Sequence, residues 1–237
     1  MPRPDGAPRP TVERFTAAQR LLHLALAVSF AGMLWTGLCL WSPALADVMG
    51  RPAAKQWHIW SAIALGAAAA LLAAARPREV AAFARAADGL DPDDVAWLRG
   101  GLRRLVDHRG APPQGWLNAG QKLNTALTTG LLAVLAGTGV LMLLGERDTA
   151  WRFGGTVPVH DVATVLIVLL VCGHLWLALA NAETRPALRG MATGRVDLDW
   201  ARVHHARWVA EIEAAATADR ASAPMPDTLP AGAEEDR

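Results

Sequence analysis

The sequence predicts an all-α integral membrane protein, a four-helix bundle with cytoplasmic termini and short amphipathic surface helices. The 237 residues are 52% hydrophobic and 19% charged, which is less charge than a soluble domain of this size usually carries. Four long stretches nearly lack charge, and the basic residues are distributed unevenly around them. The formal net charge of +1 gives no reason to expect nucleic-acid binding.

The four apolar stretches are the expected membrane spans. Their approximate bounds are 21–46, 57–75, 123–145 and 157–181. Each reaches or approaches the ~20 residues that a helix needs to cross a bilayer, and helices are expected because lipid offers no partner to open backbone groups. The membrane domain then covers 21–182. A cytoplasmic segment over 1–20 precedes it, and a cytoplasmic segment over 183–215 and a disordered tail over 216–237 follow.

The basic residues predict the orientation of these spans. Of the 23 Lys and Arg residues, 19 lie before the first span, between the second and third, or after the fourth. Because positive residues concentrate on the cytoplasmic side, both termini are expected in the cytoplasm of a bacterial inner membrane, with the multi-pass chain embedded in lipid. The first run could instead be a signal peptide cleaved after Ala46, which would remove His23. Its length, beyond the usual ~7–15 residues, disfavours that reading.

The cytoplasmic segments are expected to form short surface helices. Asp91 and Pro92 are typical of a helix start, and apolar residues recur at helical spacing from there to Val106, which predicts a helix on the inner membrane surface. A second helix is expected over 199–215. We find no internal repeat and no glycine-rich phosphate loop.

Two cysteines, Cys39 and Cys172, lie inside apolar runs, and the sequence has no C-x-x-C motif. This pattern argues against an iron–sulfur cluster, a zinc ribbon or covalently attached heme. Both cysteines are expected to be small buried hydrophobic residues.

Four of the seven histidines lie in or at the ends of the spans, where an ionisable residue usually has a function. His160 and His174 share the fourth span, 14 residues apart. They are therefore ~21 Å apart along the helix and on nearly one face. Topology then places His58 beside His160 near the outer surface and His23 beside His174 near the inner surface. Two such pairs can each hold a heme between two axial ligands, and filled axial positions favour electron transfer over catalysis at iron.

Two basic residues, Arg20 and Lys55, each precede an expected ligand by three residues. They could pair with heme propionates, although basic residues at these positions also fit an ordinary membrane interface.

The sequence resembles the cytochrome b (gamma) subunit of membrane-bound formate dehydrogenase, a relative of the cytochrome b subunit of nickel–iron hydrogenase. The similarity covers most of the chain. The matching motifs are Arg20-Leu21-Leu22-His23, Trp35-Thr36-Gly37-Leu38, His58, Asn118-Ala119-Gly120-Gln121-Lys122, His160, His174, Arg189-Gly190-Met191 and His204-His205-Ala206-Arg207-Trp208.

This resemblance implies two heme b groups on the same histidine pairs. It also implies a cytoplasmic quinone site, for ubiquinone or menaquinone, lined by Asn118, Gly120 and Gln121 beside His174. The implied partners are an iron–sulfur (beta) subunit and a molybdenum or tungsten catalytic (alpha) subunit. The chain itself would carry electrons to quinone and would not oxidise formate. A polar helix cap is the alternative role for the segment that contains Asn118.

Other functions are weighed against this one. The same diheme chain could serve a nickel–iron hydrogenase or another quinone-linked dehydrogenase. A heme-free transporter with a histidine proton relay would need more carboxylates inside the spans, where Asp161 stands alone. For a purely structural anchor, four histidines at matched depths would be a coincidence.

Overall fold

The computed structural model describes residues 9–108 and 110–222, and in that part of the chain it is helical apart from one two-stranded sheet. Four helices are long and apolar enough to cross a membrane, namely α1 (Ala17–Trp41), α3 (Arg51–Ala75), α7 (Ala119–Arg147) and α8 (Thr156–Leu179). At most 11% of their most apolar windows is buried inside the protein, so most of this apolar surface is available to lipid. The predicted four-helix membrane bundle is confirmed.

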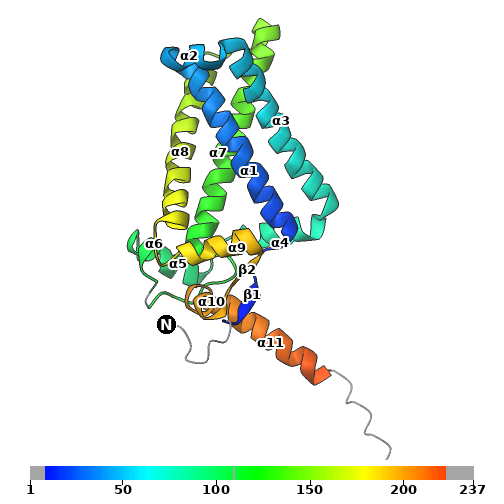
Figure 1. Cartoon of the computed structure of the whole chain (residues 1–237), viewed down its shortest axis with the longest axis vertical. Helices are drawn as coiled ribbons and strands as arrows, with labels where there is room; N and C mark the ends of the chain where they lie inside the picture. The colour runs from blue at the N-terminus through cyan, green and yellow to red at the C-terminus, as the bar shows by residue number, and fades with distance from the viewer. Residues whose placement is uncertain (1–8, 109, 223–237) are drawn as a thin grey trace, which may run out of the picture.

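The long helices form two antiparallel pairs (Figure 1). α1 packs along α3, and α7 packs along α8, whereas helices of different pairs approach each other far less closely. α2 (Pro43–Met49) connects the first pair and η1 (Thr149–Trp151) connects the second. We call the end of the bundle with these connections the hairpin end, and the opposite end the cap end.

The first span ends five residues before the predicted boundary, at Trp41. Ser42 is extended (φ −97°, ψ 120°) and Pro43 starts the separate helix α2. Proline disfavours a helical residue before it and cannot donate to the preceding turn, so the apolar run to Ala46 bends into two helices. α3 and α7 begin earlier than the predicted spans, at Arg51 and Ala119.

The loop between α3 and α7 folds into three short helices where one was predicted. They are α4 (Pro77–Ala87), α5 (Pro92–Arg99) and α6 (Arg103–Val106). Asp91 caps α5 as expected, and it forms a reciprocal capping box with Asp94. The expected helix stops at Gly100 and Gly101, where Gly101 has φ +63°, a conformation that costs glycine little.

The segment after α8 returns to the start of α1 and completes the cap end. It contains η2 (Arg185–Ala187), α9 (Leu188–Thr193), β2 (Arg195–Asp197), α10 (Leu198–His204) and α11 (Ala206–Ser222). β1 (Thr11–Glu13) pairs antiparallel with β2, with Val12 opposite Val196. Both ends of the described chain therefore lie at one end of the bundle (Figure 1).

Two predictions about this segment need correction. The helix expected over 199–215 is divided between α10 and α11, with His205 outside helical geometry (φ −143°, ψ 47°). Residues 216–222, expected to belong to the disordered tail, are helical, because α11 continues to Ser222. The remainder of that tail, 223–237, lies outside the described residues.

Candidate functional site

The four span histidines form two pairs, as predicted, and each pair joins one helix hairpin to the other. The ring centres of His58 on α3 and His160 on α8 lie 6.3 Å apart near the hairpin end. The ring centres of His23 on α1 and His174 on α8 lie 6.1 Å apart near the cap end. One helix, α8, thus contributes a histidine at both levels.

These spacings fit a heme held by two imidazoles. An imidazole nitrogen binds a metal at about 2 Å, and the ring centre lies about 1 Å farther away, so two rings on opposite sides of one metal have centres about 6 Å apart. Direct ring packing would not need both pairs to share this spacing. Glycines also face the hairpin-end rings, since a Cβ built on Gly37 would lie 3.5 Å from His58 Cε1 and one on Gly139 3.9 Å from His160 Cε1.

Threonines orient the hairpin-end rings. Thr36 Oγ1 lies 3.1 Å from His58 Nδ1, which also lies 3.0 Å from the Met33 carbonyl oxygen. Thr138 Oγ1 lies 2.8 Å from His160 Nδ1. Each hydroxyl also donates back to its own helix, Thr36 to Gly32 O at 2.7 Å. Because that bond uses the hydroxyl hydrogen, Nδ1 must be the donor to threonine, which leaves Nε2 unprotonated and available to a metal.

Sequence reasoning gave neither threonine a role, although Thr36 belongs to a matching motif and a further signal exists. In each hairpin a Thr-Gly pair precedes the histidine, and the threonine lies 22 residues before it. The two hairpins therefore share a local register around this level, even though no repeat stands out along the chain. In an antiparallel helix pair, residues 22 apart can lie opposite each other on the two helices, so this spacing indicates a contact only once the pairing is known.

The two basic residues near the pairs have partners within the protein. Arg20 donates from Nη1 to the Ala192 carbonyl at 2.8 Å, and Lys55 forms an ion pair with Glu146 at the hairpin end. Neither contact involves the paired histidines. Their predicted contact with heme propionates remains a prediction.

The segment predicted to bind quinone forms the start of α7. Asn118 caps the helix, and its side chain and that of Gln121 form a reciprocal capping box. Gln121 Oε1 also accepts from Arg14 Nη2 at 3.2 Å. Gly120 faces buried Trp97, and a Cβ there would lie 3.0 Å from its ring. The segment therefore does act as a helix cap. The side-chain NH₂ groups of Asn118 and Gln121 make no hydrogen bond with a described residue.

The short helices and strands at the cap end, which we call the cap, contain three further histidines and a buried arginine. The sequence analysis did not connect these residues. His108, His204 and His205 are at most 5% exposed. Burial lowers the pKa of His205 well below its usual value and that of His108 to about 4. Burial also lowers the pKa of Arg14 to about 9. The Arg14 guanidinium lies over the ring of Trp208 at 5.7 Å from its centroid, in a range where cation–π attraction offsets lost hydration.

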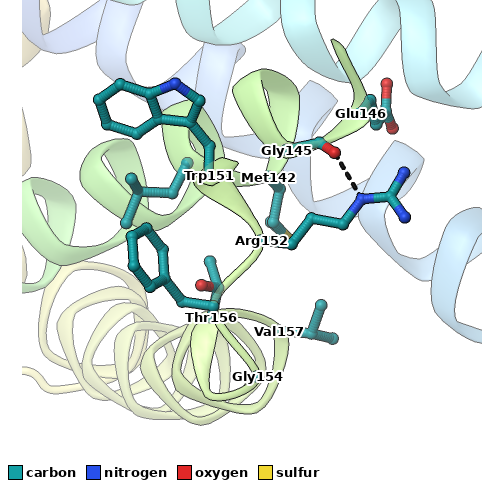
Figure 2. A pocket seen from close by; sticks show the side chains of 10 residues that line it. Met142, Gly145, Glu146, Trp151, Arg152, Gly154, Thr156 and Val157 are labelled. Carbon is teal, nitrogen blue, oxygen red and sulfur yellow. Dashed lines mark hydrogen bonds between the residues drawn. The ribbon is translucent and has the colours of Figure 1, made fainter. Parts of the chain in front are cut away.

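A hollow of about 430 Å³ lies at the hairpin end, between the end of α7 and the start of α8. Figure 2 shows Arg152 donating to the Gly145 carbonyl, with an Nε to oxygen distance of 2.6 Å. Trp151 and Thr156 also line the hollow. None of the described residues that line the hollow is a paired histidine, so the hollow is separate from the histidine site.

Comparison with known proteins identifies the family of this chain. A family model described as prokaryotic cytochrome b561 matches residues 14–194. The formate dehydrogenase cytochrome b556(fdo) subunit of Escherichia coli K12 is 26% identical over 215 residues, which cover 86% of this chain and 94% of that protein. The nitrate-inducible cytochrome b556(Fdn) subunit of E. coli K12 is 29% identical over 138 residues, 53% of this chain and 58% of that protein. The cytochrome b556 subunit of Haemophilus influenzae formate dehydrogenase is 25% identical over 219 residues, 84% and 82% of the two chains. Since the matched region contains all four paired histidines, the chain belongs to the prokaryotic cytochrome b561 family.

Proposed function

We propose that this chain is the diheme b membrane anchor of a formate dehydrogenase and carries electrons across the membrane to quinone. The observation that carries the proposal is the pair of ring spacings, 6.3 Å and 6.1 Å, at two levels of one bundle. The two α8 ligands are 14 residues apart, or ~21 Å along the helix. Two carriers at that separation divide the membrane crossing into short steps.

The protein's part in electron transfer is to hold and orient the ligands. When bound, heme b supplies a one-electron carrier whose iron changes between the ferric and ferrous states. His58 with His160, and His23 with His174, would each hold one heme iron through two imidazole nitrogens, which favours electron transfer over binding of oxygen or substrate at the iron. Thr36 and Thr138 act as positioning residues, because their hydroxyls fix which nitrogen of the hairpin-end rings faces the metal.

The start of α7 supplies the proposed quinone site. The amide oxygens of Asn118 and Gln121 are used in the capping box, while their NH₂ groups point to no partner among the described residues. Two amide donors held on a helix start can bind a quinone carbonyl oxygen next to the His174 level. Gly120 contributes by letting Trp97 pack against this turn, which keeps the donors in place.

The names of the relatives support the choice of electron donor. The three relatives named above are cytochrome subunits of formate dehydrogenases. We therefore assign an iron–sulfur subunit as the immediate donor and a molybdenum or tungsten subunit as the site of formate oxidation. We assign the cap end to the cytoplasm, because the segments there contain most of the basic residues. Electrons would then enter at the hairpin end and leave at the cap end of an inner-membrane protein.

A heme count and a quinone assay test the proposal. The full-length chain, purified in detergent, should show a reduced-minus-oxidised b-type spectrum with two hemes per chain. The protein is reduced with dithionite and the excess reductant is removed. Adding a soluble quinone analogue should then reoxidise both hemes. A folded, helical preparation without heme would overturn the proposal, and so would a diheme protein that quinone cannot reoxidise.

A further inference from the structure

A second cluster of metal-ligating side chains lies in the cap, apart from the paired histidines. His108 follows α6, His204 ends α10, and Glu183 lies in the connection after α8. The His108 and His204 ring centres are 4.3 Å apart. One ligand atom from each of the three residues lies within 4.8 Å of the others. Three segments far apart in the chain thus present two imidazoles and a carboxylate to one point.

The protonation of His204 favours a ligand role. Its Nδ1 lies 3.0 Å from the Trp200 carbonyl oxygen, which can only accept, so Nδ1 carries the hydrogen. Nε2 is then a lone-pair nitrogen, and it is buried without a partner among the described residues. A backbone carbonyl that fixes the tautomer of a histidine in this way is the usual second-shell contact of a metal ligand.

The other two residues also have side-chain atoms without a partner among the described residues, in a buried position for His108 and in an exposed one for Glu183. Nδ1 of His108 is buried and has no hydrogen-bond partner in the described chain, although the residue is only 5% exposed. The Glu183 carboxylate makes no ion pair or hydrogen bond with any described residue. Its backbone is nevertheless fixed, because Glu183 O accepts from Trp200 Nε1 at 2.9 Å and Glu183 N donates to Asn181 Oδ1 at 3.1 Å. Buried polar atoms without partners are costly, and a metal ion would satisfy both imidazoles at once.

We propose that His108, His204 and Glu183 bind a divalent transition-metal ion of the zinc class. Two imidazoles and one carboxylate suit Zn²⁺ rather than Mg²⁺ or Ca²⁺, which prefer oxygen ligands. The ion would join the α6–α7 loop, the connection after α8 and α10. It would therefore fasten the cap beside the start of α7, independently of any heme.

Zinc binding by the full-length chain tests this site directly. The protein, purified in detergent without a histidine tag and stripped with EDTA, is titrated with Zn²⁺, and bound metal is counted by mass spectrometry. Wild type should bind one Zn²⁺ per chain at micromolar free metal. Glu183→Gln and His108→Asn should each weaken binding at least tenfold, whereas the control Glu211→Gln, which removes an exposed carboxylate of α11, should bind as wild type does.

X-ray absorption at the zinc edge tests the site even if a variant fails to fold, because the measurement needs only the wild type. Heme iron does not contribute at this edge. Two imidazole ligands with the remaining ligands oxygen are expected. The proposal is overturned if wild type binds no zinc at micromolar free metal. It is also overturned if the zinc has fewer than two imidazole ligands, or if Glu183→Gln and His108→Asn, with wild-type helical content, bind zinc as tightly as wild type.

Discussion

The two histidine pairs have nearly equal ring spacings, 6.3 Å and 6.1 Å, but their surroundings differ. At the hairpin end each ring is held through Nδ1 by a threonine of the neighbouring helix. At the cap end neither His23 nor His174 makes a ring hydrogen bond to a described residue. The described residues thus orient the rings by hydrogen bonds at one level and not at the other.

The composition of α3 explains part of this difference. The last turns of α3 lie at the level of His23. From Ala67 to Ala75 this helix contains only Ala and Leu. No side chain in that stretch can accept a hydrogen bond from an imidazole. Conversely, the Thr-Gly pairs of α1 and α7 lie at the level of the hairpin-end rings, where the glycine also gives the ring room. The proposed quinone site lies at the same end of the bundle, and a ligand pair that can adapt its orientation would suit the binding of a second molecule there.

Removing a ligand should give the largest effect. His58→Ala should reduce the heme content from two to one per chain by emptying the hairpin-end level, and His23→Ala should empty the cap-end level instead. The pyridine hemochromogen assay, normalised to protein, measures both, and the spectrum of the remaining heme identifies the level. Loss of both hemes from one substitution, with helical content intact, would show that the levels are not independent.

Substitution at the start of α7 should affect only the cap-end side of the comparison. Gln121→Ala removes a proposed quinone donor and should slow reoxidation of the reduced hemes by quinone about tenfold, the factor of a lost hydrogen bond of about 1.4 kcal/mol. Stopped-flow absorbance measures the rate. Gln19→Ala is the matched control, because Gln19 forms the equivalent capping box with Thr16 on α1. Equal slowing by both variants would mean that the helix cap, and not the amide donor, matters.

Removing a positioning threonine should shift one heme potential and leave the other unchanged. Thr138→Val removes the hydroxyl acceptor of His160 Nδ1, and Thr36→Val removes one of the two acceptors of His58 Nδ1. Either loss lowers ligand basicity and destabilises the ferric form. The hairpin-end potential should therefore rise by roughly 20–60 mV, the equivalent of about 0.5–1.5 kcal/mol. Redox titration followed optically measures this. Thr164→Val serves as control, because Thr164 donates to the His160 backbone carbonyl and not to its ring; a similar shift in that variant would contradict the assignment.

Acid should loosen the cap by a smaller amount. Desolvation tends to raise the pKa of Asp91, but the hydrogen bonds from Arg207 and the Asp94 backbone, with nearby positive charge, lower it to about 2. A carboxylate with a depressed folded-state pKa stabilises the fold above its unfolded value and loses that contribution as the pH falls toward 2. Because Asp91 is one-third exposed, screening limits the contribution to about 1 kcal/mol.

The melting temperature should therefore fall between about pH 4 and pH 2 more steeply in wild type than in Arg207→Met, which lacks the partner of Asp91. Thermal melts followed by circular dichroism across this range measure the difference. Parallel pH profiles in the two proteins would show that the ion pair contributes nothing to the cap.

Much of the fold was predictable because it depends on local patterns. Each span was identified from a run of apolar residues long enough for a bilayer, and the histidine pairing followed from helix direction alone. The helix break at Ser42 and Pro43 also has a local signal, the proline. The predicted end of the first span followed the apolar run to Ala46 instead. Asp91, by contrast, was identified correctly as a helix start because its signal is a cap without a competing apolar run.

The cap could not be predicted, because its contacts join distant parts of the chain. β1 pairs with β2 across more than 180 residues, and no local pattern in three-residue strands indicates that pairing. His205 interrupts the predicted helix because it is fully buried and its Nδ1 lies 2.8 Å from the Gly115 carbonyl. Tertiary contact here overrides the helical propensity of the flanking residues.

The sequence by itself determined that four helices cross a membrane and that their histidines meet at two depths, because hydrophobic length and helical rise are properties of single segments. Only the tertiary structure decided which rings are held by threonine, which helix starts meet the cap, and that His108, Glu183 and His204 converge. Those features depend on side chains from separate segments coming within hydrogen-bonding distance, and the order of residues along one segment does not specify that.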